Sequence, residues 1–535
     1  MNIPTNFFMW SMAALPIALL ILLLVKFQVS ATKAAPITLA VTLATGVLVY
    51  KADAALLLSE GGKGLWNAFT ILLIVWTAIL LYQVGNEANA FAAIRKGLRQ
   101  LLPNQLLQLL AIGWVFESFL QGITGFGVPV AVGAPLLIGI GVQPLWAVII
   151  SLLGQSWGNT FGTLGAAWDA LAMVSDLESG SSAYLQTALW ASLFIAVWNL
   201  FTGFVMCYLY GKMQAVKKGM PAVLVIAVIQ GGGEILLSQV NTTLACFIPS
   251  CIAFAAVLLL GRSRCYRENW SCARSTIMQP VEDTDEADPH AVRALLQAFV
   301  PYIVLSVLTL AALLITPLKM ALEKVSFSFS FPQTVTGYAF VNESVEKFSP
   351  FAPFTHASFY LLLSAVIGIW YYSRKGWMRT EQIRSIFKKS AAMTLPSGIA
   401  LICLVVMSKI MDGTGQTIIL ANGITQVLGT IYVLLTPFVG MLGSFMTGSN
   451  MSSNILFGGF QVATAKILHI SAPAMLGAQT AGGAIGSIIS PSKILLGTTT
   501  ADLMGSEGKV LREVFLIAIP AALLIGFILY GILCI

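Results

Sequence analysis

Apolar stretches long enough to cross a lipid bilayer recur along most of the chain. Met9–Val25, Leu65–Val84 and Phe515–Cys534 carry no charged residue, and a membrane-spanning helix needs ~20 mostly apolar residues. Helices also satisfy their backbone hydrogen bonds internally, as a lipid environment requires. The pattern therefore predicts an all-α polytopic membrane protein. Other apolar stretches, such as Leu106–Phe119, are too short to span alone, so we expect fewer crossings than apolar segments.

Two of the apolar stretches are interrupted by glycines and polar side chains. The first is Glu117–Pro129 (ESFLQGITGFGVP) and the second is Gly443–Asn454 (GSFMTGSNMSSN). Non-helical backbone is tolerated at membrane depth only where it is buried in protein or lines a cavity. A matched pair of broken hydrophobic segments is the best sequence indication of a transporter's binding site. We therefore expect broken or re-entrant helices that meet near the midplane of the membrane.

The two interrupted segments correspond to each other at a nearly constant spacing. Residues 118–122 and 444–448 share a Ser-Phe pair and a glycine at one offset (448 − 122 = 326). Further along, Gln155 falls opposite Gln479 (479 − 155 = 324). The spacing predicts an internal repeat.

The distribution of charge predicts that the two copies have opposite orientations. Only 10% of the 535 residues are charged, and the net charge is +7. The basic residues lie mostly in short loops, which is the positive-inside signal of a membrane protein and not the basic face of a nucleic-acid binder. Placing the basic loops in the cytoplasm makes Ala34–Tyr50 run outward and its counterpart Phe354–Tyr372 run inward. The sequence therefore predicts an inverted-topology repeat with the N-terminus outside.

These patterns divide the chain into four parts. Residues 1–33 form an N-terminal helix, 34–211 the first repeat, 212–353 connecting helices with a cytoplasmic and an external loop, and 354–535 the second repeat. Mixed-charge loops are expected outside near Lys51–Lys63 and around Glu234. The acidic run within residues 282–288 is expected in the cytoplasmic loop. Val325–Phe340 alternates phenylalanine with serine in its first half, which predicts a small external hairpin.

Glu117 is the candidate proton-coupling residue. A charge at mid-bilayer costs about 2.5–3.5 kcal/mol on insertion scales, so this carboxyl is expected to be neutral when dry and ionised when wet. Gln121 lies four residues on, hence on the same helical face. The alternative is that Glu117 makes a structural hydrogen bond to the broken backbone nearby.

The candidate substrate site combines exposed backbone amides with polar side chains from both interrupted segments. Backbone N–H groups at helix breaks attract an anion without a formal positive charge, and Lys493 is a candidate for neutralising an anionic substrate. The candidate substrate-binding residues are Gln121, Thr124, Gly125, Gly127, Gln155, Asn159, Thr447, Ser449, Asn450, Ser452, Ser453, Asn454, Gln479 and Lys493. The alternative is that these small and polar residues serve helix packing.

Motif searches favour a transporter over an enzyme or a pump. The sequence has no HExxH metal motif and no GxxxxGK[ST] nucleotide loop, and its three histidines are scattered. We therefore expect no metal site, no catalytic residue and no cofactor beyond a coupling ion. An intramembrane enzyme or a channel remains a minor alternative.

The chain resembles the lactate permease family of bacterial inner-membrane transporters over nearly its full length. The resemblance is carried by Phe119–Val130 (FLQGITGFGVPV), Gly443–Phe457 (GSFMTGSNMSSNILF) and the Ile-Ser-Pro that ends at Pro491. Gln121 and Asn450 stand where the family pattern has acidic residues, so the chain resembles a divergent member. The resemblance implies a proton symporter of lactate or glycolate in a bacterial inner membrane.

The leading hypothesis is thus secondary active import of a small organic anion, a lactate- or glycolate-like 2-hydroxymonocarboxylate, by proton symport. The alternative is a sodium-coupled transporter of another small carboxylate or organic anion. The expected partners are the substrate and the lipid bilayer, without nucleic acid and with a homodimer left open. The N-terminus is expected in the periplasm.

Overall fold

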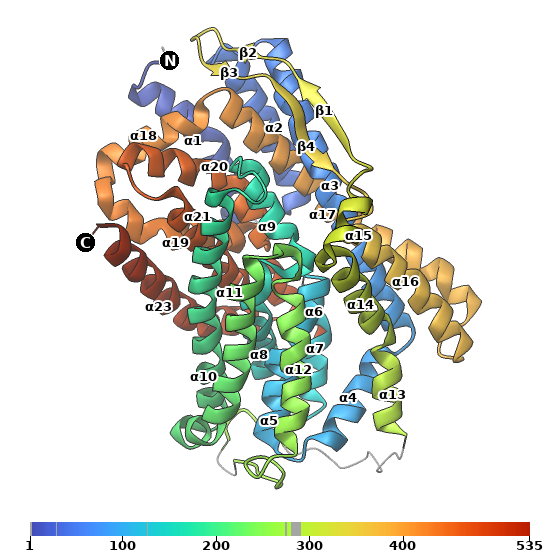
Figure 1. Cartoon of the computed structure of the whole chain (residues 1–535). Helices are drawn as coiled ribbons and strands as arrows, with labels where there is room; N and C mark the ends of the chain where they lie inside the picture. The colour runs from blue at the N-terminus through green and yellow to red at the C-terminus, as the bar shows by residue number, and fades with distance from the viewer. Residues whose placement is uncertain (1–2, 28, 126, 273–274, 280–289, 535) are drawn as a thin grey trace.

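The computed structural model describes residues 3–27, 29–125, 127–272, 275–279 and 290–534, and it is dominated by helices (Figure 1). The acidic run at residues 282–288 lies outside the described residues. Within the described part, ten helical stretches are long and apolar enough to cross a membrane, which confirms the predicted fold class. They are Phe7–Leu24, Ala31–Leu48, Ala54–Glu87, Gln105–Ile123, Ser182–Ser238, Thr242–Gly261, Ala291–Ala312, Thr380–Gly413, Gln416–Thr447 and Glu507–Cys534.

Two long helices, α3 (Ala54–Glu87) and α17 (Thr380–Gly413), pack against each other. Each has 34 residues, about 51 Å at 1.5 Å per residue, which exceeds the ~30 Å hydrocarbon core. Both bounds of α17 follow those of α3 at the offset found in the sequence (380 − 54 = 326 and 413 − 87 = 326). The helix α3 starts earlier than predicted, because Lys51–Lys63 was expected to be a loop and the helix begins at Ala54. The Asp53 side chain accepts a hydrogen bond from the Leu56 N–H and so caps the start of the helix.

Contacts between α3 and α17 show that they run antiparallel. Near the start of α3, Glu60 packs against Gly413 at the end of α17. Near the other end of the pair, the Glu87 carboxylate accepts a hydrogen bond at 2.5 Å from Lys389, and Gln83 contacts Met393. Residue numbers therefore rise along α3 as they fall along α17, which is the orientation that an inverted pair requires.

The flanking helices repeat this relation. The bounds of α2 (Ala31–Leu48) and α16 (Ala357–Arg374) also differ by 326 at both ends. The helix α2 packs on α17, and α16 packs on α3. A two-fold relation that exchanges α2 with α16 and α3 with α17 accounts for both contacts.

The same order of elements continues through two halves of the chain, which we define as the first half (residues 31–211) and the second half (residues 357–534). In the first half the remaining elements are α4 (Ala90–Leu101), α5 (Gln105–Leu110), the π-helix η2 (Ala111–Phe116), α6 (Glu117–Ile123), α7 (Val128–Ile138), α8 (Pro144–Ser156), η3 (Trp157–Asn159), α9 (Gly162–Val174) and the first limb of α10 (Ser182–Ala227). In the second half they are α18 (Gln416–Leu428), η6 (Gly429–Ile431), α19 (Tyr432–Thr447), α20 (Asn450–Leu468), α21 (Ala472–Gly486), η7 (Ser487–Ile489), α22 (Pro491–Thr500) and α23 (Glu507–Cys534).

The helices outside the two halves complete the bundle. The first limb of α10 ends where the backbone leaves helical angles at Gly211 and Lys212, next to the predicted boundary at residue 211. The second limb leads into η4 (Val228–Gly232) and α11 (Gly233–Ser238), so the predicted external loop around Glu234 is wrong: Glu234 is in a helix and fully buried. The chain continues through η5 (Thr242–Leu244), α12 (Phe247–Gly261), α13 (Ala291–Ala298), α14 (Val300–Leu314) and α15 (Thr316–Leu322), and it begins with α1 (Phe7–Ile21) and η1 (Leu22–Lys26).

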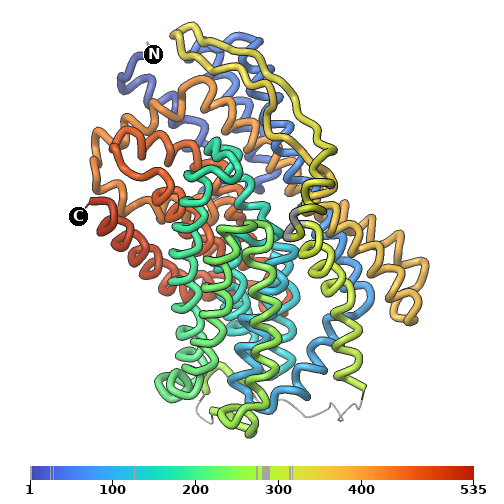
Figure 2. Tube along the Cα trace, in the orientation of Figure 1, coloured from blue at the N-terminus to red at the C-terminus, as the bar shows by residue number. Residues whose placement is uncertain are grey.

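Two short antiparallel ribbons follow α15 and lie against α3 and α17 at one end of the molecule (Figure 2). The strand β1 (Phe327–Phe331) pairs with β4 (Val345–Phe351), and β2 (Thr334–Val335) pairs with β3 (Val341–Asn342). The predicted strand pattern is confirmed, but the predicted hairpin ends too early at Phe340. The strand that pairs with β1 is β4, which begins at Val345. Phe329 packs edge-on against Trp66 of α3 at 4.8 Å between ring centroids, which attaches the ribbon to the helices.

Candidate functional site

Each half contains two interrupted helices that pack on each other. In the first half, α6 and α7 are separated at residues 124–127, and α8 gives way to η3 before α9. In the second half, α19 and α20 are separated at Gly448 and Ser449, and α21 gives way to η7 before α22. Extended contacts join α6 to α8 and α19 to α21. Phe126, inside the first interruption, lies outside the described residues.

The polar runs of the two halves contact each other directly. Thr160 and Thr480 join their hydroxyls at 3.0 Å, and the Asn159 amide donates to Ser487 at 2.9 Å. The Asn450 amide donates to the hydroxyls of Thr160 and Thr480 at 3.0 and 3.2 Å. All five residues are buried. The breaks therefore meet at one place, as the sequence predicted.

A cavity opens next to this contact. It encloses about 310 Å³ of empty space, with the open mouth included. Both halves contribute to its wall. The lining residues are Gln121, Asn159, Thr163, Ala166, Ala167, Gly448, Ser449, Asn450, Met451 and Lys493.

Lys493 is the charged residue of the cavity wall. It is buried, and its ammonium donates to the side-chain oxygens of Gln155 at 3.4 Å and Asn159 at 3.3 Å. Among the described residues no carboxylate forms an ion pair with it. Buried charges in proteins are normally paired, and in the described part of the chain this ammonium is hydrogen-bonded only to neutral amides, so it lacks a negative partner there. The cavity therefore offers a site for an anion.

Glycines shape both interruptions. Gly125 and Gly127 have φ of +58° and +84°, and Gly448 has φ of +78°, all in the left-handed region that favours glycine. A Cβ on Gly448 would collide with the hydroxyl of Ser492, and one on Gly125 would collide with that of Thr163. The candidates Gly125 and Gly127, together with Gly448, thus determine the backbone path beside the cavity.

The first half stores backbone strain at the cavity. Thr163 and Leu164 adopt left-handed angles, followed by Gly165. Left-handed conformation costs residues with a Cβ roughly 1–2 kcal/mol each. Such strain persists where the surrounding structure enforces it, often at functional sites. The Thr163 side chain lines the cavity.

Glu117 lies one helical turn from the cavity and not in its wall. It begins α6 directly after the π-helix η2, an irregularity frequent at functional sites. Its carboxyl is fully buried, accepts a hydrogen bond from Ser151 and occupies space left by Gly133. The second oxygen has no hydrogen-bond partner among the described residues. Gln121, four residues later, does reach the cavity.

Several other candidates lie behind the cavity wall. Gln479 accepts a hydrogen bond from Gln461 and donates to Ser453, and Ser453 donates to the Gly440 carbonyl. Asn454 donates to the Ala167 carbonyl at 3.0 Å, which supports the wall from outside. The hydroxyls of Thr124 and Thr447 bond to backbone carbonyls of their own segments, and the Ser452 N–H is bonded to the Ser449 hydroxyl.

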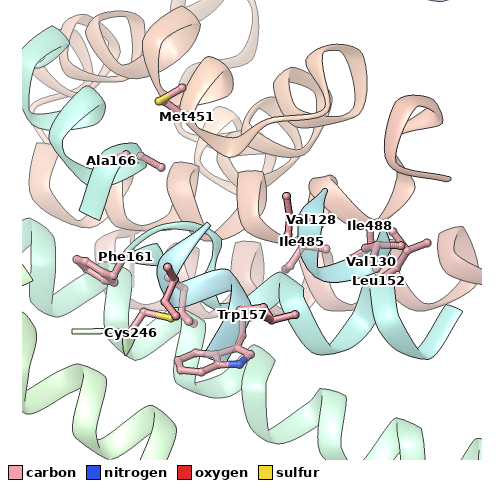
Figure 3. Packing of buried hydrophobic residues seen from close by; sticks show 14 of the residues in the cluster. Val128, Val130, Leu152, Trp157, Phe161, Ala166, Cys246, Met451, Ile485 and Ile488 are labelled. Atoms are coloured by element: carbon pink, nitrogen blue, oxygen red, sulfur yellow. The ribbon is translucent and has the colours of Figure 1, made fainter. Parts of the chain in front are cut away.

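The cavity also contains residues that the sequence did not single out. Ala166, Ala167 and Met451 form its apolar part, and Figure 3 shows Ala166 on a helix of the first half and Met451 on a helix of the second half. No sequence signal marks these three residues, because alanine and methionine are common throughout membrane helices. Thr163, by contrast, belongs to the polar run that begins at Gln155, and this run is visible in the sequence.

The spacing Gly-x-Ser-x-Gly, typical of hydrolase nucleophiles, occurs at Gly154–Gly158. Ser156 there donates to the Leu153 carbonyl at 2.6 Å and accepts from Trp198 at 2.8 Å. Its hydroxyl is thus engaged in helix packing. This geometry differs from a nucleophile that is hydrogen-bonded to a histidine.

Comparison with known proteins assigns a family. The model of the L-lactate permease family matches residues 10–534. An L-lactate permease of Halalkalibacterium halodurans is 26% identical over 513 residues, covering 94% of this chain and 92% of that protein. The glycolate permease GlcA of Escherichia coli is 24% identical, covering 96% and 94%. Among solved structures, the YdaH transporter of Alcanivorax borkumensis aligns with a TM-score of 0.44 at 13% identity, covering 86% of this chain and 84% of that one.

Proposed function

The chain belongs to the L-lactate permease family, which makes it a transporter rather than an enzyme, and we propose what it transports. It imports a small 2-hydroxymonocarboxylate, such as lactate or glycolate, by proton symport. The names of its relatives support this substrate class. The proposed location is a bacterial inner membrane with the N-terminus in the periplasm.

The observation that carries the proposal is the position of Lys493. Its buried ammonium faces a cavity without a paired carboxylate among the described residues. A substrate carboxylate supplies the missing charge. The side-chain oxygens of Gln121 and Asn450, which have no partner among the described residues, are acceptors for the substrate hydroxyl. The apolar wall of Ala166, Ala167 and Met451 suits a short alkyl group.

The substrate cavity lies between the two halves, which suits alternating access. In the proposal, the halves are inverted copies, and a relative motion of the bundles opens the cavity to one side at a time. The antiparallel packing of α3 and α17, and the constant offset between the bounds of paired helices, support this relation.

Glu117 is the proposed proton carrier. Its buried carboxyl is stabilised by a single hydrogen bond among the described residues, so it favours the neutral acid while it is dry. Opening of the cavity would admit water to the turn between Glu117 and Gln121. The carboxyl would then release its proton, which links proton movement to substrate movement.

The test is uptake by the purified protein in proteoliposomes. We expect labelled lactate and glycolate to accumulate under an inward proton gradient, without a requirement for sodium. Accumulation driven by a sodium gradient alone would mean that sodium, and not the proton, is the coupling ion. If the protein neither bound nor took up lactate or glycolate in a saturable way, the substrate assignment would be overturned.

A further inference from the structure

The connecting helices contain a buried acid that neither half of the repeat includes. Glu234 lies on α11, and Gln230 lies one turn earlier on η4, so both side chains share one helical face. Both residues are fully buried. Among the described residues, neither oxygen of the Glu234 carboxyl and neither polar atom of the Gln230 amide has a hydrogen-bond partner.

An isolated carboxylate in this position is too costly to be maintained. Transfer of a bare charge into a membrane interior is strongly unfavourable, and a buried acid without partners takes up a proton instead. Intramembrane carboxyls are rare and commonly mark proton pathways. Glu234 is thus a second acid of the kind that Glu117 represents, in a different part of the fold.

The groups around Glu234 do not supply a positive charge. The elements packed on α11 are α10, η4, η5 and α12. On α10, Ser192 accepts a hydrogen bond from Ser238, and Gly231 packs on Ala196, which places Glu234 at this level of the helix. The nearest lysine of α10, Lys212, is 16 residues beyond Ala196, about 24 Å along a helix. The titratable groups of these elements and of their caps are Tyr184, Cys207, Tyr208, Tyr210, Lys212, Lys217, Lys218, Cys246, Cys251 and Arg262. Arg262 is 16 residues beyond Cys246 (262 − 246 = 16), about 24 Å along a helix.

A short chain of contacts leads from Glu234 to the substrate cavity. Glu234 lies close enough to Cys246 for the two groups to interact electrostatically. The Cys246 sulfur is packed against Gly158, where a Cβ would meet it at 2.7 Å and would meet Cγ of Gln121 at 3.2 Å. Cys246 is part of the buried packing shown in Figure 3. Gln121 lines the cavity, so these contacts connect Glu234 to the back of the cavity wall.

We propose that Glu234, with the Gln230 amide beside it, is a second proton-binding site of this transporter, located in the connecting helices behind the substrate cavity. Binding forms the O–H bond of a neutral carboxylic acid from a carboxylate and a proton taken from water. Release returns the proton to water and requires that water reach the carboxyl in another conformation. The site is separate from Glu117 and independent of the identity of the substrate.

Infrared difference spectroscopy of the purified full-length protein tests the site directly. Subtracting the spectrum of Glu234→Gln from that of the unmodified protein removes the bands of Glu117 and of the surface acids. We expect the difference to contain a protonated-carboxyl band that disappears as the pH is raised. The matched control is Glu268→Gln, which removes an exposed acid and should keep the band. A spectrum of Glu234→Gln identical to that of the unmodified protein would overturn the proposal.

A functional measurement separates a proton site from a merely structural acid. We expect counterflow exchange of labelled lactate to depend on pH in the unmodified protein and to lose part of that dependence in Glu234→Gln. An unchanged pH profile, together with loss of the band, would show that the acid is neutral and structural. If Glu234→Gln is not monodisperse, Glu234→Asp is measured instead. A carboxyl band shifted from its position in the unmodified protein would support the site, and an unshifted band would refute it. Absence of lactate transport would refute the proposed substrate and leave the infrared result standing.

Discussion

The interrupted helices of the first half and those of the second half border the same cavity, and they differ in charge far more than in backbone. In the first half, Gly154 of α8 packs on the Gly113 backbone of η2; in the second half, Gly482 of α21 packs on the Pro437 backbone of α19. Both crossings depend on glycine, because a Cβ would collide with the opposite main chain. The backbone arrangement is therefore shared.

The charged groups are divided between the halves. The first half provides the buried acid Glu117, and the corresponding position in the second half is Gly443 (443 − 117 = 326). The second half provides Lys493, and at the offset of 324 that holds in this part of the chain the corresponding position in the first half is Asp169 (493 − 169 = 324). Gly133 leaves space for the Glu117 carboxyl, whereas Gly443 leaves space for the Ser453 side chain. One backbone plan thus supports two tasks: anion binding from the second half and proton binding from the first.

The largest expected effect comes from the lysine. Lys493→Met keeps the length of the side chain and removes its charge, so we expect lactate affinity to fall about 100-fold, because truncating one partner of a buried charge pair costs about 2–5 kcal/mol and each 1.4 kcal/mol is tenfold. Equilibrium binding to the purified protein measures this. Lys466→Met, at an exposed position of α20, is the control and should leave affinity unchanged. Equal affinity in the two variants would remove Lys493 from the site.

The second prediction concerns the acid of the first half. Glu117→Gln keeps the shape of the side chain and its contact with Ser151, but it cannot exchange a proton. We expect gradient-driven accumulation of lactate to be lost while counterflow exchange continues. Both rates can be measured in the same proteoliposomes. Normal accumulation by this variant would contradict the division of tasks between the halves.

The third prediction tests whether the interruptions are equivalent. Gly125→Ala and Gly448→Ala each place a Cβ at a left-handed position, which costs roughly 1–2 kcal/mol, and each adds a collision at the cavity. We expect both to lower substrate affinity about tenfold. Gly508→Ala, which meets open space in α23, is the control. A loss in only one of the two variants would show that the interruptions serve different purposes.

The smallest expected effect is at the contact between the halves. Ser487→Ala removes the one acceptor of the Asn159 amide that lies in the second half, and a neutral hydrogen bond contributes about 0.5–1.5 kcal/mol. We therefore expect lactate affinity to fall about two- to tenfold. Thr499→Ala, whose hydroxyl bonds only within its own helix, provides the comparison. An effect as large as that of Lys493→Met would mean that the hydroxyl contacts substrate.

Much of the fold and part of the candidate site could be predicted from patterns between residues that are close in the sequence. The all-helical fold, the interrupted segments and the constant offset between the two copies follow from the lengths of apolar runs and from the positions of glycine and hydroxyl residues. The same patterns placed Lys493, Asn159 and Asn450 among the candidates, and the cavity includes all three. Glu234 was misplaced in a loop, because four polar or glycine residues before it resemble a connection.

The sequence by itself determined that the chain is a bundle of membrane helices with two related interruptions, because helix formation and insertion depend on local composition. Only the tertiary structure decided which polar groups form the cavity and which support it. Gln479 and Asn450 are both buried amides in interrupted segments, yet one is paired with Gln461 and Ser453 while the other lines the cavity. That distinction depends on how helices from distant parts of the chain cross, and no local pattern encodes a crossing.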